Sequence, residues 1–183
     1  MKMLDRFLQW WRIAEARPYI AKGARVLDVG CGDGALFRQI PGLGPSVGID
    51  PVLASSRKHV ECAVLLKGYF PDVLPAPEPF DAITLLAVLE HMPDEQLRNL
   101  SRNCSEHLKP GGYLLVTVPS PAVDVILSAL KTLRMIDGMA LGEHHCFDVH
   151  KTPACLEGHG LSLVRKKKFQ LGLNNLFVFR KDA

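Results

Sequence analysis

Three glycines at alternate positions, Gly30, Gly32 and Gly34, are the residues whose type and spacing most clearly indicate chemistry. Glycine tolerates positive φ and lets the backbone approach a ligand closely, and a helix that follows adds free N–H donors at its N-terminus. The apolar run at 25–29 predicts a buried strand before the glycines, and residues 34–40 predict a short helix after them. A strand, a glycine turn and a helix in this order form the nucleotide site of a doubly wound α/β domain.

The glycine spacing and two nearby acids indicate which nucleotide such a loop binds. A dinucleotide-binding fold favours G-x-G-x-x-G, whereas here the second and third glycines are separated by one residue. Asp28 lies within the first predicted strand, and Asp50 ends a second predicted strand at 46–50. A carboxylate at that strand end can accept hydrogen bonds from both hydroxyls of an adenosine ribose. The pattern therefore favours an adenosyl ligand over a typical dinucleotide.

With these residues the sequence resembles the class I S-adenosylmethionine (SAM)-dependent methyltransferases. In that family Asp-x-Gly-x-Gly-x-Gly is the cofactor loop, and the acid after the second strand holds the ribose. The resemblance implies that Asp28 orients the loop and the amino-acid end of SAM, and that Asp50, with Pro51 beside it, holds the ribose. It also implies that the backbone of three residues faces the cofactor: Gly30, Cys31 and Gly32.

The segment after a fourth predicted strand, at 80–87, adds to this resemblance. The run Val-Leu-Glu-His-Met-Pro-Asp at 88–94 closely resembles methyltransferases of the ubiquinone/menaquinone-biosynthesis type, often called type 11. Ligands of open α/β sheets bind outside the carboxyl ends of the strands. The end of the strand predicted at 80–87 and the residues after it should therefore lie beside the transferred methyl group. The residues concerned are Leu86, Ala87, Glu90 and His91. For His91 we favour a place in the wall of the cofactor pocket; a catalytic base and a purely structural histidine are the alternatives.

The residues that would bind the adenine depart from the commonest form of the family. An acid just after the third strand usually takes the adenine amino group, but here Tyr69 and Phe70 stand there and the nearest acid is Asp72. Either Asp72 reaches back, or the backbone of Tyr69 and Phe70 binds the adenine edge while an aromatic ring stacks on it. We favour the second interpretation. A third is that both aromatic rings only pack under the loop.

The N-terminal segment predicts an amphipathic helix at 3–17, ended by Pro18. The simplest interpretation is a helix that covers one edge of the sheet. In the family an N-terminal helix forms a lid over the cofactor and supplies an aromatic or basic contact. The resemblance therefore implies a helical lid over residues 1–22, with Arg12 pairing with the cofactor carboxylate.

Residues 120–150, where families of this fold differ, are expected to form an insertion that carries the acceptor chemistry. A helix is predicted at 123–136, and a histidine-rich stretch follows it. We predict that His144 or His145 lies at the acceptor pocket, as a general base for an acceptor hydroxyl. The alternative is a histidine-rich loop that only packs over the sheet edge. No metal site is expected, because the spacing of histidines and cysteines fits no structural zinc signature.

The order of the predicted elements fixes the expected fold. Strands alternate with helices over short links, including a helix predicted at 51–60 and a third strand at 62–67, so the sheet should be parallel. The last two strands, 161–170 and 174–181, predict an antiparallel hairpin. The resemblance implies an α/β fold with a Rossmann-like doubly wound sheet of seven strands, order 3-2-1-4-5-7-6, the last strand antiparallel, in one domain over residues 1–183.

Composition places the chain among ordinary globular proteins. Of its 183 residues, 48% are hydrophobic and 22% are charged, and the net charge of +3 is too small to imply nucleic acid. No apolar run approaches the roughly 20 residues that a membrane-spanning helix needs. The first residues carry charges where a signal peptide needs an apolar stretch, and the five cysteines lack a C-x-x-C pair. We therefore expect a cytoplasmic protein without a disulfide framework.

These motifs occur in the expected order over residues 20–181 and together imply a SAM-dependent methyltransferase that releases S-adenosylhomocysteine (SAH). The chain lacks the Asn/Asp-Pro-Pro-Tyr/Phe run of many enzymes that methylate amino groups of nucleic acid and protein. A small molecule methylated at oxygen or carbon is therefore the expected acceptor, and the enzyme is expected to be a monomer or homodimer. The alternatives are a catalytically silent SAM-binding scaffold and an NAD-type oxidoreductase, which the glycine spacing and the hairpin disfavour.

Overall fold

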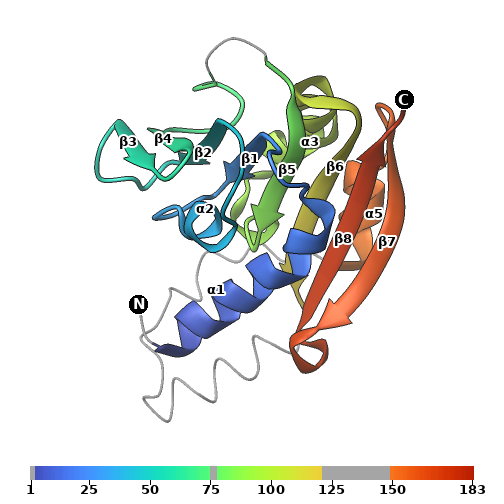
Figure 1. Ribbon diagram of the computed structural model, residues 1–183. Coiled ribbons are helices and arrows are strands. Elements are labelled where there is room, and N and C mark those ends of the chain that lie inside the picture. Colours follow the sequence, from blue (N-terminus) through green and yellow to red (C-terminus); the bar gives the residue numbers. More distant parts are fainter. Residues whose placement is uncertain (1–2, 75–77, 121–148) are drawn as a thin grey trace.

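Short apolar segments bounded by glycine and proline form the central sheet. The computed structural model describes residues 3–74, 78–120 and 149–183, and in them eight strands make one sheet in the order β3-β4-β2-β1-β5-β6-β8-β7 (Figure 1). The strands are β1 Val26–Val29, β2 Ser46–Asp50, β3 Arg57–Val60, β4 Ala63–Lys67, β5 Phe80–Leu86, β6 Leu108–Pro119, β7 Leu161–Phe169 and β8 Asn174–Lys181.

The predicted strand order is confirmed, with one strand added at an edge. Without β3, the order β4-β2-β1-β5-β6-β8-β7 is the expected 3-2-1-4-5-7-6. Strands β1, β2, β4, β5 and β6 are parallel to one another, and β8 is antiparallel to both β6 and β7. The sheet therefore has the antiparallel C-terminal hairpin that the sequence predicted.

The helix predicted at 51–60 is wrong, because its second half is the added strand β3. Within this segment only Leu53 and Val60 are buried, which is too narrow an apolar face to hold a helix against the sheet. Arg57–Val60 instead pairs antiparallel with β4, and Val60 opposite Ala63 leaves a turn at Glu61, which has a φ of 51°. The seven predicted strands thus become eight.

Helices cover both faces of the sheet. Helices α1 and α2 lie on one face, where they share a core with Val26 and Leu65; α3 and α5 lie on the other, with Leu27 and Ile83 (Figure 1). The helices are α1 Met3–Ala16, α2 Ala35–Gln39, α3 Asp94–His107 and α5 Thr152–Leu156, with 3₁₀ turns η1 Arg17–Tyr19, η2 Leu89–His91, η3 Val149–Lys151 and η4 Gln170–Gly172. In the described ranges no helix is long and apolar enough to cross a membrane.

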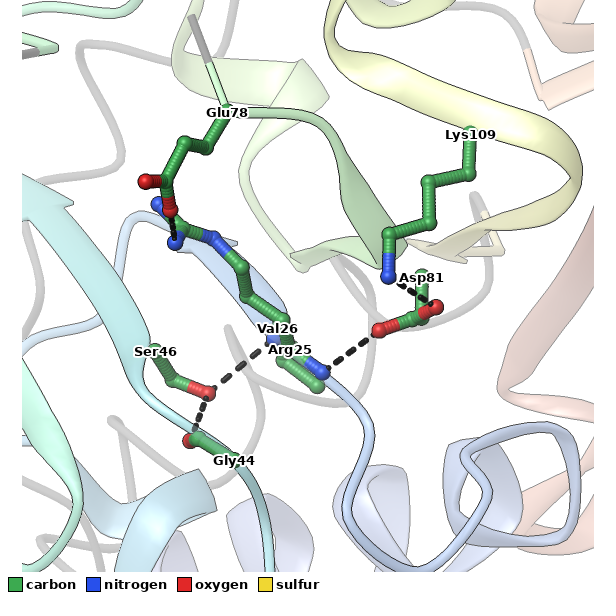
Figure 2. A network of polar contacts seen from close by, with 7 residues as sticks. All are labelled: Arg25, Val26, Gly44, Ser46, Glu78, Asp81 and Lys109. Carbon is green, nitrogen blue, oxygen red and sulfur yellow. Dashed lines mark hydrogen bonds and ion pairs between the residues drawn. The ribbon is translucent and has the colours of Figure 1, made fainter. Parts of the chain in front are cut away.

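Polar side chains tie the strands together at the end of the sheet opposite the glycine loop (Figure 2). The Asp81 carboxylate accepts hydrogen bonds from Arg25 N at 2.8 Å and from Lys109 Nζ at 2.7 Å. Ser46 Oγ accepts a bond from Val26 N at 3.0 Å. These contacts join β1 to β2, β5 and β6 where the strands begin, so they fix the end of the sheet that lies away from the glycine loop.

Candidate functional site

The glycine loop is fastened to the carboxyl end of β2 by the Asp50 side chain. Asp50 Oδ2 accepts a hydrogen bond from Gly32 N at 2.8 Å, and Oδ1 accepts one from Val52 N at 3.0 Å. The carbonyl of Ile49 also accepts a bond from Gly30 N at 2.8 Å. Asp50 is only 7% exposed, so its carboxylate is held in one orientation at the edge of the sheet. The two acid-bearing segments that the sequence singled out therefore meet.

Two of the loop glycines are needed for different reasons. Gly30 has a φ of 75°, and a Cβ placed on it would lie 2.4 Å from Val88 Cγ2, so the protein itself excludes any side chain there. Gly32 has a φ of 51°, and a Cβ placed on it would meet nothing within 4 Å. Its backbone thus borders open space beside Asp50, as the backbone of a loop that cradles a ligand must.

Asp28 is buried at the end of β1 with a single side-chain partner. Thr84 Oγ1 donates a hydrogen bond of 2.6 Å to Asp28 Oδ1, and β1 and β5 pair these residues directly. Burial raises the pKa of Asp28 to about 7; the Thr84 bond opposes the shift and the charge of Asp50 adds to it. A cation bound beside Asp28 would favour its ionised form. Thr84 was not predicted, although a lone hydroxyl in an apolar strand was a visible signal.

Cys31 contributes backbone rather than a thiol to the loop. Its side chain is 4% exposed and packs so closely on β2 that a Cβ on Gly48 would lie 2.8 Å from Cys31 Sγ. Burial, with the nearby charges of Asp28 and Asp50, raises the pKa of the Cys31 thiol. The thiol therefore stays protonated, and its main role is to fix the loop against the sheet.

The aromatic pair after β4 is divided between the surface and the core. Tyr69 is 54% exposed, whereas Phe70 is 8% exposed and its ring packs edge-on against His107 at 5.5 Å between centroids. Asp72 and Pro51 are both exposed near the same end of the sheet. Of the two rings, Tyr69 is the one with a free face, and Phe70 offers the ligand only its backbone.

The segment that leaves β5 turns sharply. Ala87 has a φ of 60°, which is strained for a residue with a side chain, and its N–H donates to Thr117 O at 3.0 Å. Leu86 and Ala87 are partly buried, Glu90 is 6% exposed and His91 is exposed. This turn carries the Glu-His pair to the carboxyl edge of the sheet, where the charge of Glu90 acts on Arg12 of α1.

Helix α1 brings the half-buried Arg12 side chain to this edge. Burial lowers the pKa of the Arg12 guanidinium, and the negative charges of Glu90 and Asp5 oppose the shift. Arg12 Nε is buried without a hydrogen-bond partner. Between α1 and the glycine loop lies a cleft of about 950 Å³ that is lined by Arg6, Gln9, Trp10, Gly32, Asp33, Ala35, Arg38 and Gln39. The predicted N-terminal helix thus does lie beside the loop.

Comparison with known proteins identifies the family. A model of the methyltransferase domain family matches residues 4–166, which is most of the chain. The chain belongs to the methyltransferase domain family. Its relatives include a protein named ubiquinone biosynthesis O-methyltransferase from Xanthomonas campestris pv. campestris, which is 37% identical over 142 residues. That match covers 70% of this chain and 57% of the relative, so this methyltransferase domain spans little more than half of the relative's length.

Solved structures share the fold of this methyltransferase domain at low identity. The N-methyltransferase NodS from Bradyrhizobium japonicum, solved in complex with SAH, has a TM-score of 0.60 and 18% identity; the match covers 98% of this chain and 87% of that one. A chain from the complex between the Haloferax volcanii Trm112 methyltransferase activator and its methyltransferase partner has a TM-score of 0.72 and 14% identity, covering 96% and 91%. The doubly wound methyltransferase fold is therefore confirmed.

The remaining residues that the sequence predicted at the site belong to the segment between β6 and η3. His144, His145 and most of the insertion at 120–150 lie outside the described residues. Within the part of the chain that the structure describes, no group of three or more His, Cys, Asp or Glu side chains could hold a metal ion. We use the name acceptor side for α1, the turn after β5, and the facing ends of β6 and β8.

Proposed function

We propose that this protein transfers a methyl group from SAM to a small-molecule acceptor, at oxygen or carbon, and releases SAH. The observation that carries the proposal is the Asp50 carboxylate bonded to Gly32 N at 2.8 Å beside open space, with Asp28 buried on the neighbouring strand. Support comes from two similar proteins: an O-methyltransferase of ubiquinone biosynthesis and an N-methyltransferase solved with SAH. A monomer or homodimer would suffice for this activity.

The cofactor would be held by residues from five segments at the carboxyl edge of the sheet. They are Asp28, Gly30, Cys31, Gly32, Asp50, Pro51, Tyr69, Phe70, Leu86, Ala87, His91 and Arg12. Asp50 uses one lone pair of each oxygen for the backbone, and each oxygen retains another for a ribose hydroxyl. Asp28, with its pKa near neutrality, can pair with an ammonium group once it ionises. The Arg12 guanidinium supplies a positive charge for a carboxylate.

Chemistry at this site needs alignment more than acid–base assistance. When bound, SAM supplies a methyl group on a positively charged sulfur, which is already activated for direct displacement. Helix α1 closes over the edge of the sheet and excludes water, and the loop fixes the ligand through backbone atoms. A hydroxyl acceptor also needs a base, for which we propose His144 or His145.

Calorimetric titration of the purified protein with SAM, SAH and NAD tests the proposal. We expect micromolar binding of the two adenosyl compounds and none of NAD. The Asp50→Ala variant should bind SAM at least about 10-fold more weakly, because the ribose and the loop lose charge-assisted hydrogen bonds. Glu106→Ala, which removes an exposed carboxylate on the far face of the sheet, is the matched control and should change nothing.

The outcomes of this titration separate the competing functions. Unchanged SAM affinity in Asp50→Ala would remove the ribose assignment, and selective binding of NAD would favour an oxidoreductase. A folded protein that binds SAM but never transfers radiolabelled methyl to any component of a cell extract would be a SAM-binding scaffold.

A further inference from the structure

Two side chains on the acceptor side are buried with an unsatisfied polar atom. Thr117 is 0% exposed and Asn174 is 2% exposed, and neither Thr117 Oγ1 nor Asn174 Oδ1 has a hydrogen-bond partner. A buried polar group without a partner destabilises a fold, so native proteins contain few of them. One bound group that contacts both atoms would satisfy them.

The pairing of β6 with β8 places these two side chains on one face of the sheet. Thr117 lies opposite Leu176, and Pro119 lies opposite Asn174. Side chains alternate between faces along a strand, and Leu176 faces the core under α1, so Thr117 and Asn174 face α1 as well. They are diagonal neighbours with Cβ atoms roughly 7 Å apart. The two polar atoms make no hydrogen bond with each other, and this separation lets one bound group contact both.

A chain of hydrogen bonds fixes which atom Asn174 presents. The Leu8 carbonyl of α1 can only accept, so Gln170 Nε2 donates to it at 2.9 Å and Gln170 Oε1 points away. Asn174 Nδ2 then donates to Gln170 Oε1 at 3.1 Å, which leaves Asn174 Oδ1 as the open atom. The site therefore offers a fixed acceptor from Asn174 beside a hydroxyl hydrogen from Thr117.

Thr117 and Asn174 lie at the end of the sheet where a ligand would bind, rather than in the middle of the core. Thr117 pairs with Leu86 at the carboxyl end of β5, next to the turn that carries Glu90. It lies two strands from Asp28, or roughly 10 Å. Figure 1 shows α1 crossing this end of the sheet beside the start of β8.

Helix α1 can open above these residues from one end. Its two buried residues, Ile13 and Ala16, lie near its C-terminal end, whereas Phe7 and Trp10 toward its N-terminal end are about half exposed. Segments with few buried apolar contacts open locally at low free energy. A ligand can therefore reach Thr117 and Asn174 when the N-terminal half of α1 moves outward, and the Gln170–Leu8 bond orients Asn174 once the helix closes again.

We propose that Thr117 and Asn174 bind a hydroxyl group of the methyl acceptor, at a position remote from the atom that is methylated. The hydroxyl donates its hydrogen to Asn174 Oδ1 and accepts the hydrogen of Thr117 Oγ1. A carboxylate has no hydrogen for Asn174, and an ammonium leaves the Thr117 hydrogen without an acceptor. That the ligand is the methyl acceptor rests on the function proposed above.

Phenol and its methyl ether anisole are suitable probes, because they differ only in the hydrogen that Asn174 would accept. Both are titrated into the full chain, with and without saturating SAH. We expect phenol to bind about 10-fold more tightly than anisole. Thr117→Val should weaken phenol binding about 5- to 10-fold and leave the affinities for anisole and SAH unchanged.

Thr152→Val is the matched control. Thr152 is also 0% exposed with an unpartnered Oγ1, but it begins α5 on the opposite face of the sheet. Both substitutions remove an unsatisfied hydroxyl and should raise the melting temperature, by about 2 °C or more. Only Thr117→Val should weaken phenol binding.

Several results would overturn the proposal. These are no binding of phenol, equal affinities for phenol and anisole, and phenol affinity that Thr117→Val leaves unchanged. A lower melting temperature in Thr117→Val alone would also overturn it, because the hydroxyl would then be bonded to a structural water. SAH binding is scored separately: if SAH fails to bind while phenol is discriminated, the hydroxyl site stands and the methyltransferase assignment falls.

Discussion

The two halves of the carboxyl edge of the sheet differ in whether their buried polar groups have hydrogen-bond partners within the protein. At the ends of β1 and β2 the acids are satisfied internally, Asp28 by Thr84 and Asp50 by the backbone of Gly32 and Val52. At the ends of β6 and β8, Thr117 and Asn174 each retain an atom without a partner. Polar groups that bond one another keep their positions before a ligand binds. Unsatisfied groups gain their hydrogen bonds only when the ligand binds. We infer a preformed cofactor side and an acceptor side completed by its ligand.

The largest expected effect tests the ionisation of Asp28 in the cofactor half, at the ends of β1 and β2. Asp28 ionises at about pH 7 in the folded protein and near its ordinary value of 3.8 when unfolded. Between these values the folded state binds more protons, so the free energy of unfolding falls as pH rises through this window, by on the order of 4 kcal/mol in total. Asp28→Asn should lack this component. Urea denaturation of both proteins from pH 4 to pH 8, compared as a difference, isolates it.

The same ionisation should appear in cofactor binding. Because SAM carries positive charge, its affinity for the wild-type protein should rise between pH 6 and pH 8, and Asp28→Asn should show a flat profile. If the free energy of unfolding depends on pH in the same way in both proteins, Asp28 is ionised throughout this pH range. Its pKa in the folded protein would then lie below neutral pH.

The next effect tests the rigidity of the glycine loop. Gly30→Ala places a Cβ 2.4 Å from Val88 Cγ2 at a φ of 75°, while Gly23→Ala has a φ of 77° and meets nothing within 4 Å. Both variants carry the strain of positive φ, about 1 kcal/mol, but only Gly30→Ala adds an overlap, for a total of about 3 kcal/mol. Urea denaturation measures the difference. Equal losses would show that Val88 yields, and that the loop is less rigid than the paired acids indicate.

The cofactor half was also the half that the sequence predicted best. Its elements combine short apolar strands with glycine turns, and the strand order and the α1 and α3 helices were predicted closely. Strand β3 was missed, because its hairpin turns at Glu61 and Cys62 rather than at an Asn-Gly or Asp-Gly pair. The Asp50–Gly32 bond could not be predicted, because it depends on the relative position of two segments.

The acceptor half was predicted least, for a physical reason. Thr117 and Asn174 stand among apolar residues of two strands that are distant in sequence, and only the register of β6 against β8 brings them together. Nothing in the sequence tells whether a buried hydroxyl has a partner. The only signal was that they are polar residues within buried strands. The same signal at Thr84 marks a satisfied hydroxyl, because Thr84 donates a hydrogen bond to Asp28.

The smallest expected effect is a change in the free energy of unfolding that has opposite signs in the two halves. Thr84 and Thr117 are both 0% exposed and face α1 from neighbouring strands. Thr84→Val removes the donor to Asp28 and leaves a buried carboxyl unpartnered, so the free energy of unfolding should fall by about 2 kcal/mol. Thr117→Val removes an unsatisfied hydroxyl, so it should rise by about 1 kcal/mol. Urea denaturation at pH 6, without ligand, gives both values. If both variants lose stability, the Thr117 hydroxyl is satisfied in the absence of a ligand, and the acceptor half is as preformed as the cofactor half.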